Sequence, residues 1–375
     1  MTTLDDPRHD REVGSRHIVP GSTHDTTRID DVRIDSVRPL ITPALLQEKL
    51  PVPEAALMLV EATRAQIAAV LDGRDDRLLA VVGPCSIHDH GQALEYAARL
   101  HALATELAGE LLVVMRVYFE KPRTTVGWKG YINDPQLDGS FAINEGLERA
   151  RRLLLEVLAL GLPASTEFLD LLSPQFISDL VSWGAIGART TESQSHRQLA
   201  SGLSCPVGFK NGTDGSVKVA TDAIVAARSP HAFIGMTKMG QCAVFETRGN
   251  PDCHVILRGG REPNHDAAQV EAACALLRAA GLPERLMVDC SHGNSRKDHR
   301  RQAEVATDLA GQIAGGERRI VGVMVESHLH EGRQDLVPGQ PLRWGVSITD
   351  ACLGWAQTEP LLRELAQAVR ARRQG

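Results

Sequence analysis

The chain has 375 residues, 43% hydrophobic and 23% charged, with a formal net charge of −6 and seven cysteines that form no CxxC pair. This composition suits one large core; the weak negative charge excludes partners held by a broad basic field, such as nucleic acid, and the odd cysteine count favours reduced thiols in the cytoplasm. No stretch approaches the roughly 20 apolar residues of a membrane span, and the polar N-terminus lacks the apolar core of a secretory signal.

The N-terminal part of the chain precedes any regular pattern. Residues 1–28 show no apolar periodicity, which predicts a flexible arm. Residues 30–40 alternate enough to predict a short extended segment. A helix follows whose apolar face runs from Leu57 to Leu71, and Gly73 stands just past its end.

From residue 76 onward, short apolar runs alternate with amphipathic helices, which indicates a parallel sheet. The predicted strands are 78–82, 111–117, 164–168, 185–188, 206–209, one piece of 232–258, 286–289 and 320–325. The predicted helices lie near 91–108, 141–160, 174–182, 192–201, 216–228, 266–280, 298–314 and 358–372. Eight strands with alternating helices favour a closed (β/α)8 TIM barrel over 76–375, preceded by an N-terminal extension over 29–75.

Two local signals refine this plan. Ser173 and Pro174 predict a helix start, with Ser173 as the cap and Pro174 at the first helical position. The stretch 232–258 holds three strand-like pieces where one is expected, so we predict an inserted β-hairpin near 233–250 that turns at Met239 and Gly240. The pattern alone does not decide which piece is the sixth barrel strand.

Cationic residues gather where the predicted strands end, which is where the active sites of such barrels lie. They are Arg116, Lys121, Arg123, Arg189, Lys210 and Arg258. Arginine forks and lysine point charges match phosphate and carboxylate oxygens, so this rim predicts a substrate with two or three anionic groups. Nearby glycines (Gly187, Gly212, Gly215, Gly259 and Gly260) could admit backbone amides to a phosphate or could be ordinary turn residues.

Metal-capable side chains form a second group at strands that adjoin one another in a closed barrel. They are Cys85, His292, Glu326 and Asp350. A mixed sulfur, nitrogen and oxygen set suits a transition cation such as Mn, Fe, Co or Zn. The spacing alone leaves open a buried thiol, a hydrogen-bonded histidine and structural carboxylates.

Several long motifs resemble one enzyme family. They are GPCSIHD (83–89), KPRTTVGWKG (121–130), GARTTESQ (187–194), FKNGTDG (209–215), ILRGG (256–260), CSHGNS (290–295), VESH (325–328) and SITDAC (347–352). Together they resemble the microbial, feedback-regulated branch of the type I 3-deoxy-D-arabino-heptulosonate-7-phosphate (DAHP) synthases, from about residue 30 to the C-terminus. The resemblance implies condensation of phosphoenolpyruvate with erythrose 4-phosphate and water, the first step of the shikimate pathway.

The resemblance also implies roles for single residues. One divalent metal ion, whose identity stays open, would be held by Cys85, His292, Glu326 and Asp350. Phosphoenolpyruvate would meet Arg116, Lys121 and Lys210 at its carboxylate and reacting end, and Ala188, Arg189 and Arg258 at its phosphate. Erythrose 4-phosphate would bind to Lys121, Pro122, Arg123 and Thr124. The catalytic candidates are Lys121, His292 and Glu167.

Regulation by an aromatic amino acid is a further implication of the resemblance. The implied effector residues are Asp31, Pro174, Gln175, Leu203, Ser204, Phe233 and Gly235. Gly235 resembles the tyrosine-sensitive relatives, whereas Asp31 resembles the phenylalanine-sensitive ones, so we favour tyrosine and place phenylalanine next. The family also suggests a homodimer or homotetramer.

Three alternatives compete with this interpretation. Lys210 closes a predicted strand as the lysine of a Schiff-base aldolase does. The eight-carbon sugar acid synthases share the expected barrel, but the intact KPRTTVGWKG motif disfavours them. A non-catalytic sensor of sugar phosphates or amino acids should have lost Cys85 or His292, and the chain has both.

Overall fold

The computed structural model describes residues 29–123, 125–337 and 339–375. The described residues up to Leu40 form one compact unit, and Ile41–Gly375 form another. In the first unit, Asp31 has a left-handed φ of 54° and its carbonyl accepts a hydrogen bond from Ile34 N at 3.0 Å. A turn therefore replaces part of the predicted extended segment, and no strand follows it before residue 41. The predicted arm over 1–28 lies outside the described residues.

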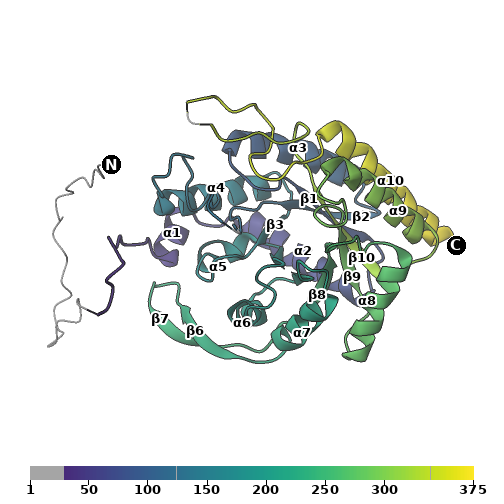
Figure 1. Cartoon of the computed structure of the whole chain (residues 1–375), viewed down its shortest axis with the longest axis horizontal. Helices are drawn as coiled ribbons and strands as arrows, with labels where there is room; N and C mark the ends of the chain where they lie inside the picture. The colour runs from purple at the N-terminus through teal and green to yellow at the C-terminus, as the bar shows by residue number, and fades with distance from the viewer. Residues whose placement is uncertain (1–28, 124, 338) are drawn as a thin grey trace, which may run out of the picture. The chain divides into compact units, whose positions relative to one another are not determined.

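The second unit is built on a closed barrel of eight parallel strands. In space the strands follow the order β1-β10-β9-β8-β5-β4-β3-β2, and every neighbouring pair is parallel (Figure 1). Their bounds are β1 (Leu78–Gly83), β2 (Leu111–Arg116), β3 (Ala164–Glu167), β4 (Trp183–Ile186), β5 (Val207–Lys210), β8 (Cys253–Leu257), β9 (Leu286–Asp289) and β10 (Ile320–Glu326). All their residues are buried, as both faces of a parallel sheet require. The predicted TIM barrel is confirmed.

Helices follow the strands and cover the outside of the barrel, as α9 and α10 show side by side in Figure 1. The bounds are α1 (Pro43–Lys49), α2 (Glu54–Asp72), α3 (His90–Glu106), α4 (Ile143–Ala159), α5 (Pro174–Ile177), α6 (Gln194–Gly202), α7 (Val217–Ala227), α8 (Ala267–Ala279), α9 (Gln302–Ala314) and α10 (Trp355–Gln374), with short 3-10 turns at Ser178–Leu180 and His299–Arg301. Among the residues described, none of these helices has the length and apolar character needed to cross a bilayer.

Helix α2 contributes to the core inside the barrel. Ile67, Val70 and Leu71 pack in one cluster with alternate strand residues such as Leu79 and Val114. Because alternate strand residues face the barrel interior, this helix fills the end of the barrel at which the strands begin. Leu57, which the apolar pattern predicts on the buried face, is exposed, and the adjacent Ala56 is buried instead.

The inserted hairpin is present between α7 and β8. It consists of β6 (Ala232–Met236) and β7 (Cys242–Glu246), which pair antiparallel. Gly240 has a left-handed φ of 79°, and Thr237 N donates to Gln241 O at 2.8 Å, so the chain turns where the sequence predicted. The third strand-like piece, β8, is the sixth barrel strand and pairs with β5 and β9.

Helix α5 corrects one expectation. Pro174 is its first residue as predicted, but Ser173 has helical φ and ψ and makes no capping hydrogen bond. Its hydroxyl instead donates to Glu120 Oε2 at 2.9 Å. Ser173 therefore joins the loop after β2 to the segment before α5.

Candidate active site

A cavity of about 520 Å³ lies at the end of the barrel where the strands finish. Eight of the predicted substrate residues line it: Arg116, Lys121, Pro122, Arg123, Ala188, Arg189, Lys210 and Arg258. Glu167, His292, Glu326 and Asp350 line it as well. Thr124 lies outside the described residues. The structure therefore brings the described substrate candidates into one space, while their individual roles stay predictions.

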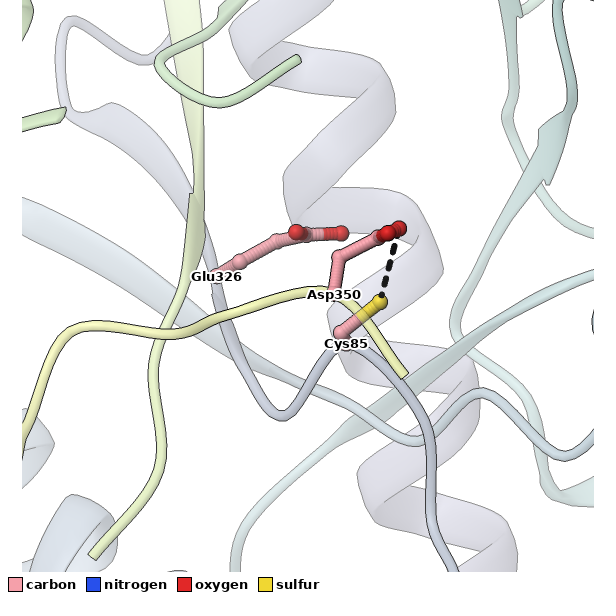
Figure 2. Close-up of side chains that lie close together, drawn as sticks. All are labelled: Cys85, Glu326 and Asp350. Atoms are coloured by element: carbon pink, nitrogen blue, oxygen red, sulfur yellow. Dashed lines mark hydrogen bonds between the residues drawn. The ribbon is translucent and has the colours of Figure 1, made fainter. Parts of the chain in front are cut away.

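Three of the four predicted metal ligands form a compact group. The side chains of Cys85, Glu326 and Asp350 point toward one another from the loop after β1, the end of β10 and the loop before α10 (Figure 2). Their candidate ligand atoms all lie within 4.8 Å of one another, and Cys85 Sγ is 3.4 Å from Asp350 Oδ2. His292, the fourth, has Nε2 3.9 Å from Glu326 Oε1.

This donor set fits a single divalent cation. Metal–ligand bonds of about 2.0–2.3 Å place ligand atoms on one ion roughly 3–5 Å apart, which is the spacing within the Cys85, Glu326 and Asp350 group and between His292 and Glu326. Burial, followed by the charge of Glu326, raises the pKa of Cys85 to about 11. A cation that binds must therefore displace the thiol proton, and one sulfur, one nitrogen and two carboxylates suit a borderline metal.

Two cations adjoin this group. Arg116 is 1% exposed and lies over the Tyr118 ring at 3.6 Å, and its Nη2 donates to Glu326 Oε1 at 2.8 Å. Lys121 Nζ is 3.0 Å from Cys85 Sγ. Burial alone would lower the pKa of Lys121, but the charges of Cys85 and Glu326 raise it above its ordinary value. Lys121 is therefore a proton-bearing group beside the ligand cluster.

Asp289 is a site residue that the sequence analysis missed. It is fully buried at the end of β9, and its Oδ2 lies 3.1 Å from Lys210 Nζ and 3.0 Å from His292 Nδ1. Burial alone would raise its pKa, but Lys210 and His292 hold that pKa well below the ordinary value. Its position directly before the CSHGNS motif, at a strand end, was the available signal.

The predicted phosphate end of the cavity contains an arginine with unused hydrogen-bonding capacity. Arg258 Nε is buried without a hydrogen-bond partner among the residues described. Burial, followed by the charge of Arg189, lowers the pKa of Arg258 despite the attraction of Asp289. An anion between Arg189 and Arg258 would supply the missing partner and remove the repulsion between the two arginines.

Glycines join the loops that hold these cations. A Cβ on Gly260 would stand 2.4 Å from the Cα and N of Gly215, and one on Gly259, which has a φ of 73°, would stand 2.5 Å from Asn294 N. Asn211 ties the same loops together, because its side chain donates to Gly259 O at 2.9 Å and accepts from Arg258 N at 2.8 Å. At these two positions the glycines serve close backbone packing.

Glu167 lines the same cavity but is not a member of the Cys85, Glu326 and Asp350 group. It is 7% exposed at the end of β3, and its Oε1 has no hydrogen-bond partner among the residues described. A Cβ on Gly187 would come within 2.5 Å of that oxygen, so the glycine makes room for the carboxylate. An unpaired buried carboxylate beside a substrate cavity is suited to hold a water molecule or a substrate hydroxyl.

A larger cavity of about 760 Å³ lies between the hairpin and the neighbouring α5 and α6 segments. Six predicted effector residues line it: Pro174, Gln175, Leu203, Ser204, Phe233 and Gly235. Asp31, the seventh, belongs to the first unit and is not among the residues that line this cavity. The rings of Phe233 and Phe245 stack with centroids 6.1 Å apart, which gives this cavity an aromatic wall.

The fold and the site together define a barrel protein with a cation-lined cavity beside a cluster of candidate metal ligands. The DAHP synthetase I family matches residues 54–363. The chain belongs to this family, and the expectation drawn from its motifs is confirmed.

The names of similar enzymes give different amino acids as the effector. The chain is 60% identical over 344 residues to the Phe-sensitive phospho-2-dehydro-3-deoxyheptonate aldolase of Escherichia coli K12, covering 92% of this chain and 98% of that one. It is 55% identical over 359 residues to the tyrosine-inhibited enzyme of Schizosaccharomyces pombe, covering 94% and 96%. It is 56% identical over 342 residues to the Trp-sensitive enzyme of Enterobacter agglomerans, covering 91% and 98%.

A solved structure supports the fold. The phospho-2-dehydro-3-deoxyheptonate aldolase of Francisella tularensis SCHU S4 superposes with a TM-score of 0.89 at 48% identity, covering 90% of this chain and 99% of that one. The family and the enzyme class are therefore shown, whereas the effector differs among relatives of similar identity.

Proposed function

We propose that the chain condenses phosphoenolpyruvate with erythrose 4-phosphate and water to give DAHP and inorganic phosphate, the first step of the shikimate pathway. The observation that carries the proposal is the cavity at the barrel mouth, where the described cations surround a Cys85, Glu326 and Asp350 cluster. The named activities of relatives that are 55% to 60% identical support the same reaction.

The cations would bind phosphoenolpyruvate in a fixed orientation. Arg189 and Arg258 would take its phosphate together with the Ala188 amide, and Arg116 and Lys210 would face its carboxylate. Two anionic substrates repel each other in water, so positive charges fixed inside a cavity lower the cost of bringing them into register.

Erythrose 4-phosphate would enter along residues 121–124. There C3 of the enol phosphate attacks the aldehyde carbon, a water adds to C2, and the hemiketal releases phosphate. Lys121 would give a proton to the new alkoxide, since its raised pKa keeps it protonated at neutral pH. Glu167 and His292 would orient the water. A divalent cation, when bound by Cys85, His292, Glu326 and Asp350, would supply Lewis-acid polarisation of the aldehyde oxygen.

A phosphate-release assay tests the reaction. Purified chain with both substrates should release phosphate, and neither substrate alone should do so. A chelator should abolish the activity, and one of Mn, Fe, Co or Zn should restore it. No release with any metal would refute the reaction, and activity indifferent to the chelator would refute the metal site alone.

Borohydride trapping separates this reaction from that of a Schiff-base aldolase. Lys210 makes an ion pair with buried Asp289, which is the setting of a fixed cation rather than of a free nucleophilic amine. Borohydride added with the substrates should therefore trap no adduct on Lys210. A non-catalytic sensor would bind the substrates without releasing phosphate.

We also propose that an aromatic amino acid inhibits the enzyme from the cavity beside the hairpin, with tyrosine favoured over phenylalanine. Gly235 supports this choice, because a Cβ there would stand 2.8 Å from Phe245 Cδ2. A side chain at this position would displace that ring and take space that a phenolic hydroxyl could use.

The Gly235→Ser variant tests the effector. We expect its half-inhibitory tyrosine concentration to rise about tenfold relative to that of phenylalanine, equivalent to about 1.4 kcal/mol. Ala243, which pairs with Gly235 across the hairpin but does not line the cavity, gives the control Ala243→Ser. An unchanged tyrosine-to-phenylalanine ratio in Gly235→Ser would contradict the tyrosine assignment.

Assembly and location complete the proposal. We expect a homodimer or homotetramer, which light scattering of the full chain would establish. All seven cysteines are free thiols, consistent with a reducing cytoplasm.

A further inference from the structure

A small cavity lies at the opposite end of the barrel from the proposed active site. It holds about 60 Å³ and is lined by residues that precede β1, β9 and β10, by Gly73 at the end of α2, and by Arg372 in the last turn of α10. Three arginines line it: Arg285, Arg318 and Arg372. We name it the arginine cavity. None of them belongs to the site at the barrel mouth.

Charge at this end is unbalanced. Asp75 is bound by Arg77, with Nη2 2.6 Å from Oδ2, and Asp76 is bound by the neighbouring Arg373, with Nε 2.8 Å from Oδ2. Both aspartates therefore already have a guanidinium partner. Among the residues described, the three arginines of the arginine cavity make no ion pair with a carboxylate.

Two of these three arginines donate to backbone oxygens. Arg285 Nη1 donates to Arg318 O at 3.0 Å, and Arg372 Nη2 donates to Asp76 O. Gly73, with a φ of 75°, leaves the space that Arg285 uses, since a Cβ there would meet Arg285 Nη2 at 2.5 Å. Arg285 and Arg372 are thus held by backbone oxygens, and the two carboxylates that also line this cavity, Asp75 and Asp76, are each already paired with another arginine.

Arg372 carries the strongest sign of a missing ligand. It is 6% exposed, and its Nε is buried without a hydrogen-bond partner among the residues described. Burial lowers the pKa of Arg372, and Arg318, Arg373 and Arg285 lower it further against the attraction of Asp76. A buried guanidinium with an unused donor and like-charged neighbours costs stability unless an anion joins it.

We propose that the arginine cavity binds a tetrahedral oxyanion, either free phosphate or the phosphate group of a phosphorylated metabolite. A volume of about 60 Å³ admits one such group and little more. Guanidinium forks match its oxygens, and three of them would neutralise its charge. The bound anion would link the end of α10 to the starts of β9 and β10, and would therefore stabilise the fold without entering the reaction.

Crystals of the full chain soaked in selenate test the site directly, because selenate is tetrahedral and scatters anomalously. We expect one anomalous peak within hydrogen-bond distance of Arg285 and Arg318, in addition to any peak at the barrel mouth. A peak at the barrel mouth alone would overturn the proposal. This measurement needs no variant, so impaired folding cannot obscure it.

Thermal unfolding in solution gives the second test. With phosphoenolpyruvate saturating the barrel mouth, inorganic phosphate should raise the Tm of the wild-type chain by about 1–3 °C above chloride at equal ionic strength. Arg318→Ala and the Arg285→Ala, Arg318→Ala double variant should lose at least half of that shift. Arg74→Ala removes an exposed arginine outside the cavity and should keep it.

A parallel titration with glucose 6-phosphate distinguishes the source of the anion. A larger, variant-sensitive shift with glucose 6-phosphate identifies a metabolite phosphate group, and a larger shift with inorganic phosphate identifies the free ion. Equal shifts in wild type and double variant with both compounds would overturn the proposal.

Discussion

Asp289 arranges two other side chains at the site. Its Oδ2 lies near both Lys210 Nζ and His292 Nδ1, and its Oδ1 accepts from Ser291 Oγ, which is 2.6 Å from the same ring nitrogen. The lysine that lines the cavity and the ring of a predicted metal ligand therefore share one anchor, directly and through Ser291. A histidine that binds metal through one nitrogen is oriented by the group on its other nitrogen. His292 has a φ of 57°, a strained value for a non-glycine residue. Such strain is typical of functional sites, where neighbouring contacts fix the orientation of a side chain.

The Asp289→Asn variant should lower both metal affinity and kcat/KM by about 10- to 100-fold, because it leaves Lys210 without a counter-charge and weakens the hold on His292. Chelator competition and steady-state kinetics measure the two effects. Asp298→Asn, an exposed change in the same loop, is the matched control and should alter neither. Unchanged metal affinity in Asp289→Asn would show that the carboxylate does not position the ring.

Glu120 is a buried carboxyl next to Lys121 in sequence. Burial, and then the Asp170 carboxylate, raise the pKa of Glu120 from 4.5 to about 7. The folded chain therefore binds this proton more tightly than the unfolded chain does. Between about pH 4.5 and 7 the folded state holds more protons, so the contribution of Glu120 to stability falls as pH rises through this window and stays low above it.

The Glu120→Gln variant should remove that pH-dependent loss while keeping an acceptor for Ser173. We expect it to be more stable than wild type at pH 8 by up to roughly 3 kcal/mol, and to gain nothing at pH 4.5. Urea unfolding across the pH range measures the difference. The same pH dependence in both proteins would mean that folding does not raise the pKa of Glu120.

Single residues were the hardest feature to predict from sequence. Ser173 has the residue type of a helix cap, yet its hydroxyl donates to Glu120 instead. The local sequence does not show this, because Glu120 is a buried carboxyl from a distant part of the chain. Cys85, Glu326 and Asp350 were grouped correctly, since strand ends converge in any closed barrel. Asp289 was missed, because its role depends on Lys210, which lies at the end of a different strand.

At the scale of elements, the loops after β5, β8 and β9 are packed backbone to backbone through glycines. Gly260 lies against Gly215, and Arg258 precedes this contact by two residues. The orientation of an arginine predicted to bind phosphate therefore depends on residues that carry no side chain.

The Gly260→Ala variant should force these loops apart, since its Cβ would meet backbone atoms at 2.4 Å. We expect kcat/KM for phosphoenolpyruvate to fall at least about tenfold and stability to fall by about 1–3 kcal/mol. Gly311→Ala is the control, because its Cβ meets nothing within 4 Å inside α9, and it should stabilise by about 1 kcal/mol. Wild-type kinetics in Gly260→Ala would contradict the loop-packing role.

Elements were predictable where the pattern repeats. The strand predicted over 286–289 matches β9, and seven of the eight barrel strands were predicted to within two residues at each end. The exception is the sixth, for which three pieces of 232–258 competed. That competition was settled by pairing: β8 has barrel neighbours on both sides, a fact invisible to a local pattern. Helix α1 was missed, although Thr42 and Pro43 form a recognisable start, because seven residues span too few turns to show a period.

At the scale of the whole molecule, α2 closes the end of the barrel at which the strands begin. Ile67 is fully buried among strand residues inside the barrel. Strand periodicity predicts a closed barrel but does not say what fills its lower end, since this depends on a helix that precedes the first strand.

The Ile67→Ala variant should destabilise the fold by about 2–5 kcal/mol, because it leaves a cavity in a core with little freedom to collapse. Met58→Ala, an exposed change on the same helix, should have almost no effect. Calorimetry or urea unfolding measures both. Activity at low temperature should survive in Ile67→Ala, since the substitution is far from the barrel mouth.

The hairpin enters the chain after α7 and leaves it before β8, and β5 still pairs with β8 as though nothing had been inserted. The proposed effector cavity can therefore change during evolution while the pairing of the barrel strands stays the same. Such a change would explain why relatives of nearly equal identity are named as sensitive to three different amino acids. The proposed effector site makes residues 232–246 the segment to exchange in order to alter feedback inhibition without changing the barrel.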